Sequence, residues 1–291
     1  MSDLAKRWMV ALVGIPVVLG LLYLGGWALA VPVAVLAALG SLEVDRLAAQ
    51  GGVASLRTLI ALGTTAMVLA AGWRTDFVGF APVALTALVA TGALALVGAV
   101  RVRGPEGKPL AAVGATLFGV LYVGVPLSFA PLLHALPEAH GWSTGSAWSG
   151  ALVVALPLAA TWLGDAVAFF AGTAWGKGGL APSISPNKSW VGVWGGLAGA
   201  AVAGAVWFLI AQRALPGLPL PGVLSAALVG VILGIGAILG DLVESLLKRD
   251  AGVKDSGTFF PGHGGILDRL DALIFTLPAA YAALLVMEAA S

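Results

Sequence analysis

The chain has 291 residues, of which 59% are hydrophobic and only 10% are charged, and its formal net charge at pH 7 is +1. A soluble domain would carry about a quarter charged residues, so the excess apolar surface must face lipid. The near-neutral charge argues against nucleic acid as a partner, and the absence of cysteine excludes disulfides, thiolate catalysis and cysteine-ligated metals. We therefore predict an all-α integral membrane protein, a polytopic bundle of about nine transmembrane helices.

Nine apolar segments, separated by polar or glycine-rich breaks, are the predicted spans. In chain order they are 8–24, 27–42, 58–72, 77–100, 110–133, 149–172, 189–211, 222–246 and 265–287. The first follows Lys6 and Arg7 and resembles a cleavable signal peptide, but we favour a span that stays attached, because its apolar run overshoots a usual signal core. The separation of the first two spans rests on the short sequence GGW alone.

Basic residues favour one orientation of these spans. With the N-terminus inside, thirteen Lys and Arg residues lie on or near the cytoplasmic side, and only Arg74 and Arg213 lie outside. This asymmetry predicts an odd number of spans with the N-terminus in and the C-terminus out. The longest outside loop, residues 134–148, carries no Lys or Arg, and we interpret its two histidines as solvated.

Glycines spaced four apart occur in the later spans and predict close helix contacts, although glycine is so frequent here that chance is a rival explanation. The pairs are Gly192/Gly196, Gly195/Gly199, Gly230/Gly234 and Gly236/Gly240. Pro16, Pro126 and Pro157 are expected to bend their spans.

The first polar interruption covers residues 164–190. Asp165 lies inside or at the edge of a span, where a carboxylate is costly, so it is either functional or the partner of a Lys or Arg. The glycine-rich stretch that follows holds Lys188 and predicts a helix N-terminus near Ser189, a combination that suits an anion. Such loops are common between helices, so this pattern is weak evidence by itself.

Two carboxylate pairs border the last two spans. Asp241 and Glu244 are three residues apart, as are Asp268 and Asp271, so each pair shares one helix face. Facing carboxylates are costly unless a cation or basic side chain compensates them. Oxygen ligands suit Mg²⁺, and basic neighbours suit phosphate oxygens. These neighbours are Lys248, Arg249, Lys254 and Arg269. His263, between glycines, fits a proton donor and a structural hydrogen-bonding group equally well. The residues alone therefore predict a metal–phosphate site at the cytoplasmic face.

Residues 245–271 resemble the signature of the phosphatidate cytidylyltransferase family, also called CDP-diacylglycerol synthase. The matching positions are Ser245, Lys248, Arg249, Lys254, Asp255, Pro261, His263, Gly264, Gly265, Asp268, Arg269 and Asp271. SPNKSW at 185–190 and GDLVES at 240–245 resemble two further family elements. Thr173 and Val191 stand where the family often has Arg and usually has Glu.

The resemblance implies transfer of a cytidylyl group from CTP to phosphatidate, which forms CDP-diacylglycerol and pyrophosphate for phospholipid synthesis. It also implies Mg²⁺ or another divalent cation, K⁺ near it, and a homodimer among the lipids of the cell (plasma or inner) membrane, with its active site on the cytoplasmic side. We expect N-terminal transmembrane helices over residues 1–109 and a catalytic region over 110–291.

The same resemblance assigns roles to individual residues. Asp241, Lys248, His263 and Asp268 are expected to be catalytic, with Asp241 and Asp268 also holding the metal. The expected phosphate-binding residues are Ser185, Asn187, Lys188, Ser189, Arg249, Lys254 and Arg269. Further metal-ligand candidates are Asp165, Glu244, Asp255 and Asp271.

Three alternatives stay open. A transporter would use intramembrane carboxylates near the midplane, spread over inverted repeats, whereas here they gather at one face beside basic residues. Another lipid-phosphate transferase, such as a CDP-alcohol phosphatidyltransferase, would carry the motif Asp-x-x-Asp-Gly-x-x-Ala-Arg, which is absent. A non-catalytic homologue that keeps the signature is the third.

Overall fold

A computed structural model of the chain describes residues 3–102, 104–143, 145–257 and 264–290, with side chains from residue 14 onward. The helices are α1 Asp3–Leu24, α2 Gly26–Gln50, α3 Arg57–Trp73, α4 Phe77–Val102, α5 Pro109–Gly119, α6 Val125–Leu127, α7 Phe129–Ala139, α8 Ser149–Trp175, α9 Trp190–Ala211, α10 Val223–Asp250 and α11 Leu267–Ala290. A 3-10 turn at Pro105–Gly107, a π-helical turn at Val120–Gly124 and two short strands, β1 Gly179–Ala181 and β2 Ser185–Ser189, complete the described elements. The predicted helical class is confirmed, with one small hairpin added.

Seven helices in the described part of the chain are long and apolar enough to cross a membrane. They are α2, α4, the composite segment Pro109–Ala139, α8, α9, α10 and Leu267–Ala289 of α11. Two further apolar helices are shorter, Gly14–Leu24 and Arg57–Trp73. Each predicted span therefore has a helix, while the count of nine crossings and their orientation stay predictions. The long apolar helices support an integral membrane protein.

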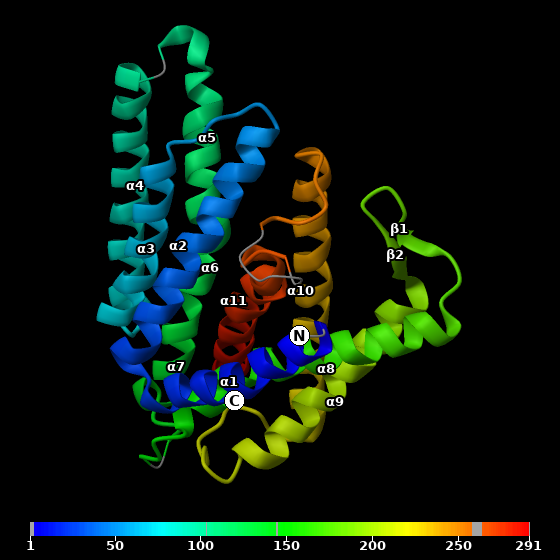
Figure 1. The fold of residues 1–291 in the computed structure, drawn as a ribbon. Coiled ribbons are helices and arrows are strands. Elements are labelled where there is room, and N and C mark those ends of the chain that lie inside the picture. Colours follow the sequence, from blue (N-terminus) through cyan, green and yellow to red (C-terminus); the bar gives the residue numbers. More distant parts are fainter. Residues whose placement is uncertain (1–2, 103, 144, 258–263, 291) are drawn as a thin grey trace.

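In Figure 1, α2, α3, α4 and α5 stand side by side as an upright bundle, with α10 and α11 beside it. Helices α8 and α9 run sideways from this bundle, and their outer end carries the β1–β2 hairpin. Helix α1 lies across the lower part of the molecule and contacts α8. The C-terminal ends of α2, α4 and α10 lie toward the upper side in this view, and so does the hairpin. Arg46, Arg101, Lys248 and Arg249 lie near the C-terminal ends of these helices, so many of the basic residues counted above belong to this side.

The junction between α1 and α2 depends on glycine. Gly25 has φ 59° and Gly26 has φ 49°, backbone angles that L-residues with side chains rarely adopt, so the helix must break here. The prediction of two separate helices is therefore confirmed. His134 fixes the junction, because its Nε2 lies 2.8 Å from the carbonyl oxygen of Leu22.

The prediction of an outside loop over residues 134–148 is wrong for the first residues of that range. Helix α7 continues to Ala139, so His134 is a half-buried helical residue and not a solvated loop residue. Upstream, the π turn ends at Gly124, two residues before Pro126, and the N–H of Val125 donates to the carbonyl oxygen of Val120, five residues back. Pro126 has no backbone N–H, so the regular hydrogen bonds of an α-helix, from each N–H to the carbonyl four residues back, could not continue through it.

Glycines bring α8, α9 and α10 into close contact. A Cβ atom on Gly195 would lie 2.7 Å from the Cβ of Ala171 in α8, and one on Gly199 would lie 2.9 Å from the carbonyl oxygen of Leu163. On the other side of α9, a Cβ on Gly234 of α10 would lie 2.9 Å from the Cβ of Ala200. These separations leave no room for a larger residue, so the predicted contact role of these spaced glycines is confirmed.

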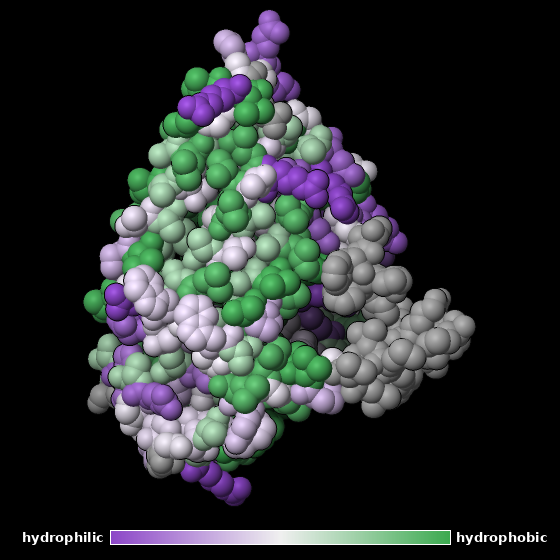
Figure 2. Space-filling view, turned by 60° about the vertical axis from the view of Figure 1, so that its left-hand side comes forward, coloured by the Kyte–Doolittle hydropathy of each residue, from purple (hydrophilic) through white to green (hydrophobic). Residues whose placement is uncertain are grey.

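The outer face of the upright bundle is hydrophobic. Only 17% of the apolar window of α4 is buried inside the protein, and Val78, Leu85 and Val89 are among its exposed side chains. Figure 2 shows this apolar surface as a broad band, with hydrophilic residues gathered toward its two ends. A surface of this kind is stable in a bilayer, where lipid tails cover the band and the polar ends reach the headgroups.

Candidate active site

The three predicted polar segments meet around α10. Lys188 of β2 pairs with Asp241 of α10, with Nζ 2.8 Å from Oδ2. Lys248 of α10 pairs with Asp268 of α11, with Nζ 2.6 Å from Oδ1. Arg249 donates from Nε to the carbonyl oxygen of Ile184 in the hairpin turn at 3.2 Å. Residues that are far apart in sequence therefore form one polar site at the end of α10.

A cavity of about 550 Å³ lies between α8, β2, α9 and α10. One part of its wall is polar, and the other is apolar. The lining residues are Asp165, Ala168, Phe169, Gly172, Thr173, Asn187, Lys188, Ser189, Gly192, Val193, Ala237, Ile238 and Asp241. A cavity with both kinds of wall suits a ligand that has a charged head and an apolar body.

The hairpin positions the basic side of this cavity. Strands β1 and β2 pair antiparallel, with Gly179 opposite Ser189. Ser189 then caps α9, because its Oγ accepts the N–H of Gly192 at 3.1 Å. The predicted helix start near Ser189 is confirmed, and it places Lys188 directly before the helix. The strands themselves were not predicted.

The Lys188–Asp241 pair is partly open to solvent, since the two side chains are 23% and 43% exposed. Asp241 also accepts a hydrogen bond from Ser245 Oγ at 3.2 Å, through Oδ1. An ion pair that water can reach contributes little stability, so an incoming phosphate or cation can replace either partner at low cost. This pair is therefore the accessible part of the site.

Lys248 forms the buried part of the site. Its Nζ lies 2.7 Å from Glu244 Oε2 as well as 2.6 Å from Asp268 Oδ1, and the side chains of Lys248, Glu244 and Asp268 are 11%, 2% and 14% exposed. One ammonium group thus faces two carboxylates. Glu244 Oε1 is buried without a hydrogen-bond partner in the described structure. The interior thus holds one ammonium group for two acidic side chains, an arrangement that further positive charge would stabilise.

Asp268 is held on both of its oxygens. Oδ2 accepts the N–H of Gly265 at 2.7 Å and both the N–H and the hydroxyl of Ser256, at 3.1 and 2.9 Å. Gly264 has φ 81°, and a Cβ there would lie 2.6 Å from Asp268 Oδ2. The glycine therefore supplies both the backbone angle and the space that this carboxylate needs.

Glu43 belongs to the same network, although no sequence pattern singled it out. Its carboxylate accepts the Ser256 hydroxyl at 2.9 Å and is 7% exposed. The predicted second span ended at residue 42, whereas α2 continues to Gln50. The available signal was that the apolar residues Val44 and Leu47, three residues apart, continue the helical pattern beyond residue 42.

The remaining predicted residues lie nearer the surface or outside the described part. Arg249, Lys254, Asp255 and Arg269 are exposed at the ends of α10 and α11 and in the connection between them, and Asn187 is exposed on β2. Asp271 is half-buried on α11, where its Oδ1 accepts the N–H of Ala272, and Ser185 is half-buried on β2. His263 lies outside the described residues.

Carboxylates outnumber lysines in this network. Five carboxylates line the cavity or take part in the linked ion pairs and hydrogen bonds, namely Glu43, Asp165, Asp241, Glu244 and Asp268, together with Lys188 and Lys248. Within the described residues, no three His, Asp or Glu side chains form a group that could hold a metal ion. Asp165 and Asp241 do line one cavity, and two carboxylates fit Mg²⁺, which completes its shell with water and substrate phosphates.

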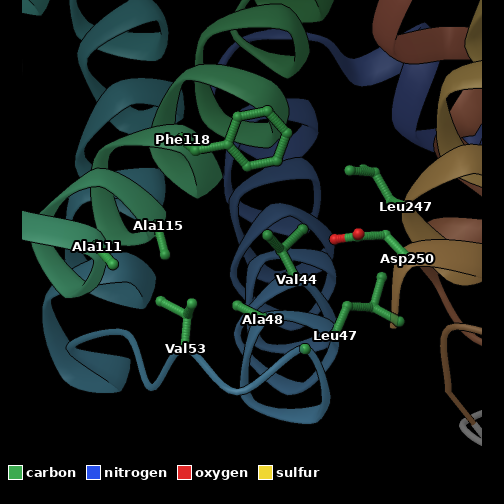
Figure 3. A pocket seen from close by; sticks show the side chains of 10 residues that line it. Val44, Leu47, Ala48, Val53, Ala111, Ala115, Phe118, Leu247 and Asp250 are labelled. Atoms are coloured by element: carbon green, nitrogen blue, oxygen red, sulfur yellow. The ribbon is translucent and has the colours of Figure 1, made fainter. Parts of the chain in front are cut away.

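A smaller hollow of about 260 Å³ lies between α2, α5 and α10 (Figure 3). Its walls are mostly aliphatic, with Val44, Leu47 and Leu247 among them, and the ring of Phe118 lies at one side. Asp250 is the charged residue among the described side chains that line it. A hollow with so few polar groups has no means of orienting a triphosphate, so the cavity beside Lys188 is the better site for one.

Known proteins are similar to this chain along most of its length. A sequence profile described as the cytidylyltransferase family matches residues 5–287. A phosphatidate cytidylyltransferase of Synechocystis sp. is 32% identical over 95% of this chain and 94% of that protein. Phosphatidate cytidylyltransferase 5, chloroplastic, of Arabidopsis thaliana is 33% identical over 90% of this chain and 67% of that protein. A phosphatidate cytidylyltransferase of Bacillus subtilis is 45% identical over 41% of this chain and 42% of that protein.

Proposed function

Because the chain belongs to the cytidylyltransferase family, we propose that it transfers the cytidylyl group of CTP to phosphatidate and releases pyrophosphate. The relatives that match most of this chain carry the name of that activity. The observation that carries the proposal is the cavity beside Lys188, which combines charged and apolar walls. Both substrates bear phosphates, and one of them is also a lipid, so a site with these two kinds of wall can accept both.

The chemistry needs one new bond and one broken bond. A phosphate oxygen of phosphatidate attacks the α-phosphorus of CTP, and the bond from that phosphorus to the oxygen bridging the β-phosphorus breaks. CDP-diacylglycerol and pyrophosphate are the products. The attacking oxygen is already anionic, so the chain does not have to supply a strong base. Its task is to orient the two phosphates and to neutralise their repulsion.

The described residues divide this task. Lys188 offers a solvent-accessible positive charge at the cavity wall, and Asn187 next to it offers an amide. Lys248, held between Glu244 and Asp268, supplies positive charge from the interior side. Arg249, Lys254 and Arg269 are exposed near the same end, where they would attract CTP from the aqueous side.

We further propose that Asp241, together with Asp165, holds a divalent cation, Mg²⁺ by preference. When bound there, the ion would neutralise charge on the triphosphate and on the departing pyrophosphate. Asp268 was the second expected ligand, but it would have to release Lys248 in order to bind the ion. Asp271, Glu244 and Asp255 are weaker candidates as ligands. A K⁺ ion near this site stays a proposal drawn from the family resemblance.

The position of the site supports a cytoplasmic active site in the cell (plasma or inner) membrane. The ion pairs involve β2 and the C-terminal half of α10, which lie toward the side where the C-terminal ends of α2, α4 and α10 gather. That side carries many of the basic residues, and the positive-inside rule assigns it to the cytoplasm. CTP is a polar nucleotide of the cytosol, while phosphatidate stays in the leaflet. The exposed aromatic residues near the cavity, Phe169, Trp190 and Trp194, suit the membrane interface where the two would meet. A homodimer, and a division into residues 1–109 and 110–291, are retained as proposals.

Pyrophosphate release by the purified protein in mixed micelles tests this function. The assay supplies phosphatidate, Mg²⁺ and each of CTP, ATP, GTP and UTP in turn. We expect release with CTP that requires phosphatidate and is lost in Asp268→Asn. Folded protein that releases no pyrophosphate with any of the four nucleotides would favour a transporter or a non-catalytic homologue.

A further inference from the structure

Glu43 of α2 is a buried carboxylate that the reaction proposed above does not use. It is 7% exposed, and both of its oxygens accept hydrogen bonds. Oε1 accepts the N–H of Ile266 at 3.0 Å, and Oε2 accepts the N–H of Leu267 at 2.8 Å and the hydroxyl of Ser256 at 2.9 Å. All three donors lie more than 200 residues further along the chain.

These three donors belong to the two described ends of the connection between α10 and α11. Ser256 lies on the α10 side of that connection, while Ile266 and Leu267 lie where α11 begins. One carboxylate from the N-terminal half thus binds both ends together. The first turn of α11 also has backbone N–H groups without helical partners, which an anion satisfies well.

The Ser256 hydroxyl links Glu43 to the ion-pair network. Its Oγ lies 2.9 Å from Glu43 Oε2 and also 2.9 Å from Asp268 Oδ2. A hydroxyl has a single proton to donate, so the two carboxylates share it. Asp268 in turn holds Lys248. The position of Glu43 is therefore transmitted to Lys248 through three contacts, with Ser256 and Asp268 as the two intervening residues.

The glycines around Glu43 fit this arrangement closely. A Cβ atom on Gly257 or on Gly265 would collide with the carboxylate oxygens of Glu43. Neither glycine has a φ in the left-handed region, so the need for glycine at these positions is one of space and not of backbone angle. The chain leaves room at both ends of the connection for one specific side chain.

A buried carboxylate is an expensive means of holding two segments together, because desolvation opposes it, and apolar packing would serve stability better. Unlike apolar packing, the carboxylate accepts three hydrogen bonds, and these fix the orientation of the Ser256 hydroxyl and of the N–H groups of Ile266 and Leu267. We propose that Glu43 is a positioning residue for nucleotidyl transfer, which fixes Ser256 and the start of α11 so that Asp268 and Lys248 meet the substrate phosphates correctly. This inference rests on the proposed function.

Three variants of the full-length protein test it. Glu43→Gln keeps the size of the side chain, but it replaces one acceptor oxygen by an NH₂ group. Because NH₂ cannot accept a hydrogen bond, at least one of the backbone N–H donors of Ile266 and Leu267 loses its partner. Glu43→Asp keeps the charge and shortens the reach. Asp45→Asn is the matched control, because Asp45 lies two residues along the same helix and accepts the Ser55 hydroxyl at 2.5 Å, away from the α10–α11 connection. We measure kcat and KM for both substrates per folded molecule, with amide hydrogen exchange at 264–267.

The expected result is a fall in kcat of about tenfold or more in Glu43→Gln, with KM for CTP changed less than about threefold, because one charge-assisted set of hydrogen bonds is lost. Exchange of the Ile266 and Leu267 amides should accelerate, Glu43→Asp should recover part of kcat, and Asp45→Asn should match the wild type. A kcat within twofold of wild type in folded Glu43→Gln would overturn the proposal.

Ser256→Ala keeps the proposal testable if Glu43→Gln does not fold. It removes the shared hydroxyl and leaves the backbone bonds of Glu43 to Ile266 and Leu267 in place. We expect kcat to fall by about fivefold without a change in the melting temperature beyond a few degrees. Full activity in this variant would contradict the link to Asp268. An inactive wild type would instead refute the proposed function.

Discussion

Replacing Lys248 by Met would remove the positive charge that lies between Glu244 and Asp268 while keeping most of the apolar stem. The two carboxylates would then stay buried at 2% and 14% exposure without their ammonium partner. Removing one partner of a buried ion pair costs about 3–5 kcal/mol. We expect the lower end, about 3 kcal/mol, because Asp268 keeps its hydrogen bonds from Ser256 and Gly265.

A loss of that size should lower the melting temperature by roughly 5–10 °C for a chain of this length. The ten tryptophans allow thermal unfolding in detergent to be followed by intrinsic fluorescence. Lys248→Met should also lose most of its CTP turnover, since the positive charge that we propose for the substrate phosphates is gone.

A second substitution separates stability from activity. Glu244→Gln in the Lys248→Met background removes one of the two unpaired charges, and Glu244 Oε1 has no partner to lose among the described residues. The double variant should regain about half of the lost stability, about 1–2 kcal/mol, but none of the turnover. If Lys248→Met melts within 1 °C of wild type, or if the double variant is less stable than the single one, the reasoning from buried charge is refuted.

Three further predictions concern the steric need for glycine at position 265, the divalent cation at Asp241 and the solvent-accessible Lys188. Gly265→Ala should destabilise the protein and abolish turnover because its Cβ meets Glu43, whereas Gly114→Ala, which has open space around it, should behave like wild type in the same melting and turnover assays. Chelation of divalent cations should stop turnover, and added Mg²⁺ should restore it; activity that survives complete chelation would refute the assignment of a cation to Asp241. Lys188→Ala should raise KM for CTP by about tenfold or more with folding unchanged, as measured by steady-state kinetics, and unchanged constants for both substrates would remove Lys188 from the site.

The sequence predicted much of the C-terminal half for clear physical reasons. The spans at 222–246 and 265–287 match α10 and α11 because long apolar runs have few alternatives to a membrane helix. The pairing of Asp241 and Asp268 with lysines follows from the cost of leaving carboxylates alone in an apolar environment. Which lysine meets which carboxylate depends on how β2 and α11 approach α10, and spacing along the chain does not contain that information.

The contacts of Glu43 and the β1–β2 hairpin could not be predicted from the sequence. The predicted span ended before Glu43 because a charge is costly in an apolar helix, yet α2 continues since donors from the α10–α11 connection satisfy the carboxylate. Those donors are two backbone N–H groups and a serine hydroxyl, which have no distinctive signal in a sequence. The strands at 179–181 and 185–189 are similar, because such short segments without alternating hydrophobic residues do not predict a sheet.

We propose that the cavity beside Lys188 and Asp241 is the place where a cytidylyl group is transferred to lipid. The most direct test follows label from CTP carrying ³²P at its α-phosphate into a chloroform-soluble product, with purified protein, phosphatidate and Mg²⁺. On this proposal, wild type and Asp250→Asn, a control on the same helix outside the cavity, should both produce labelled lipid, and labelling should fall by about a hundredfold or more in Asp241→Asn. Unlabelled lipid from folded wild-type protein, or undiminished labelling in Asp241→Asn, would contradict it.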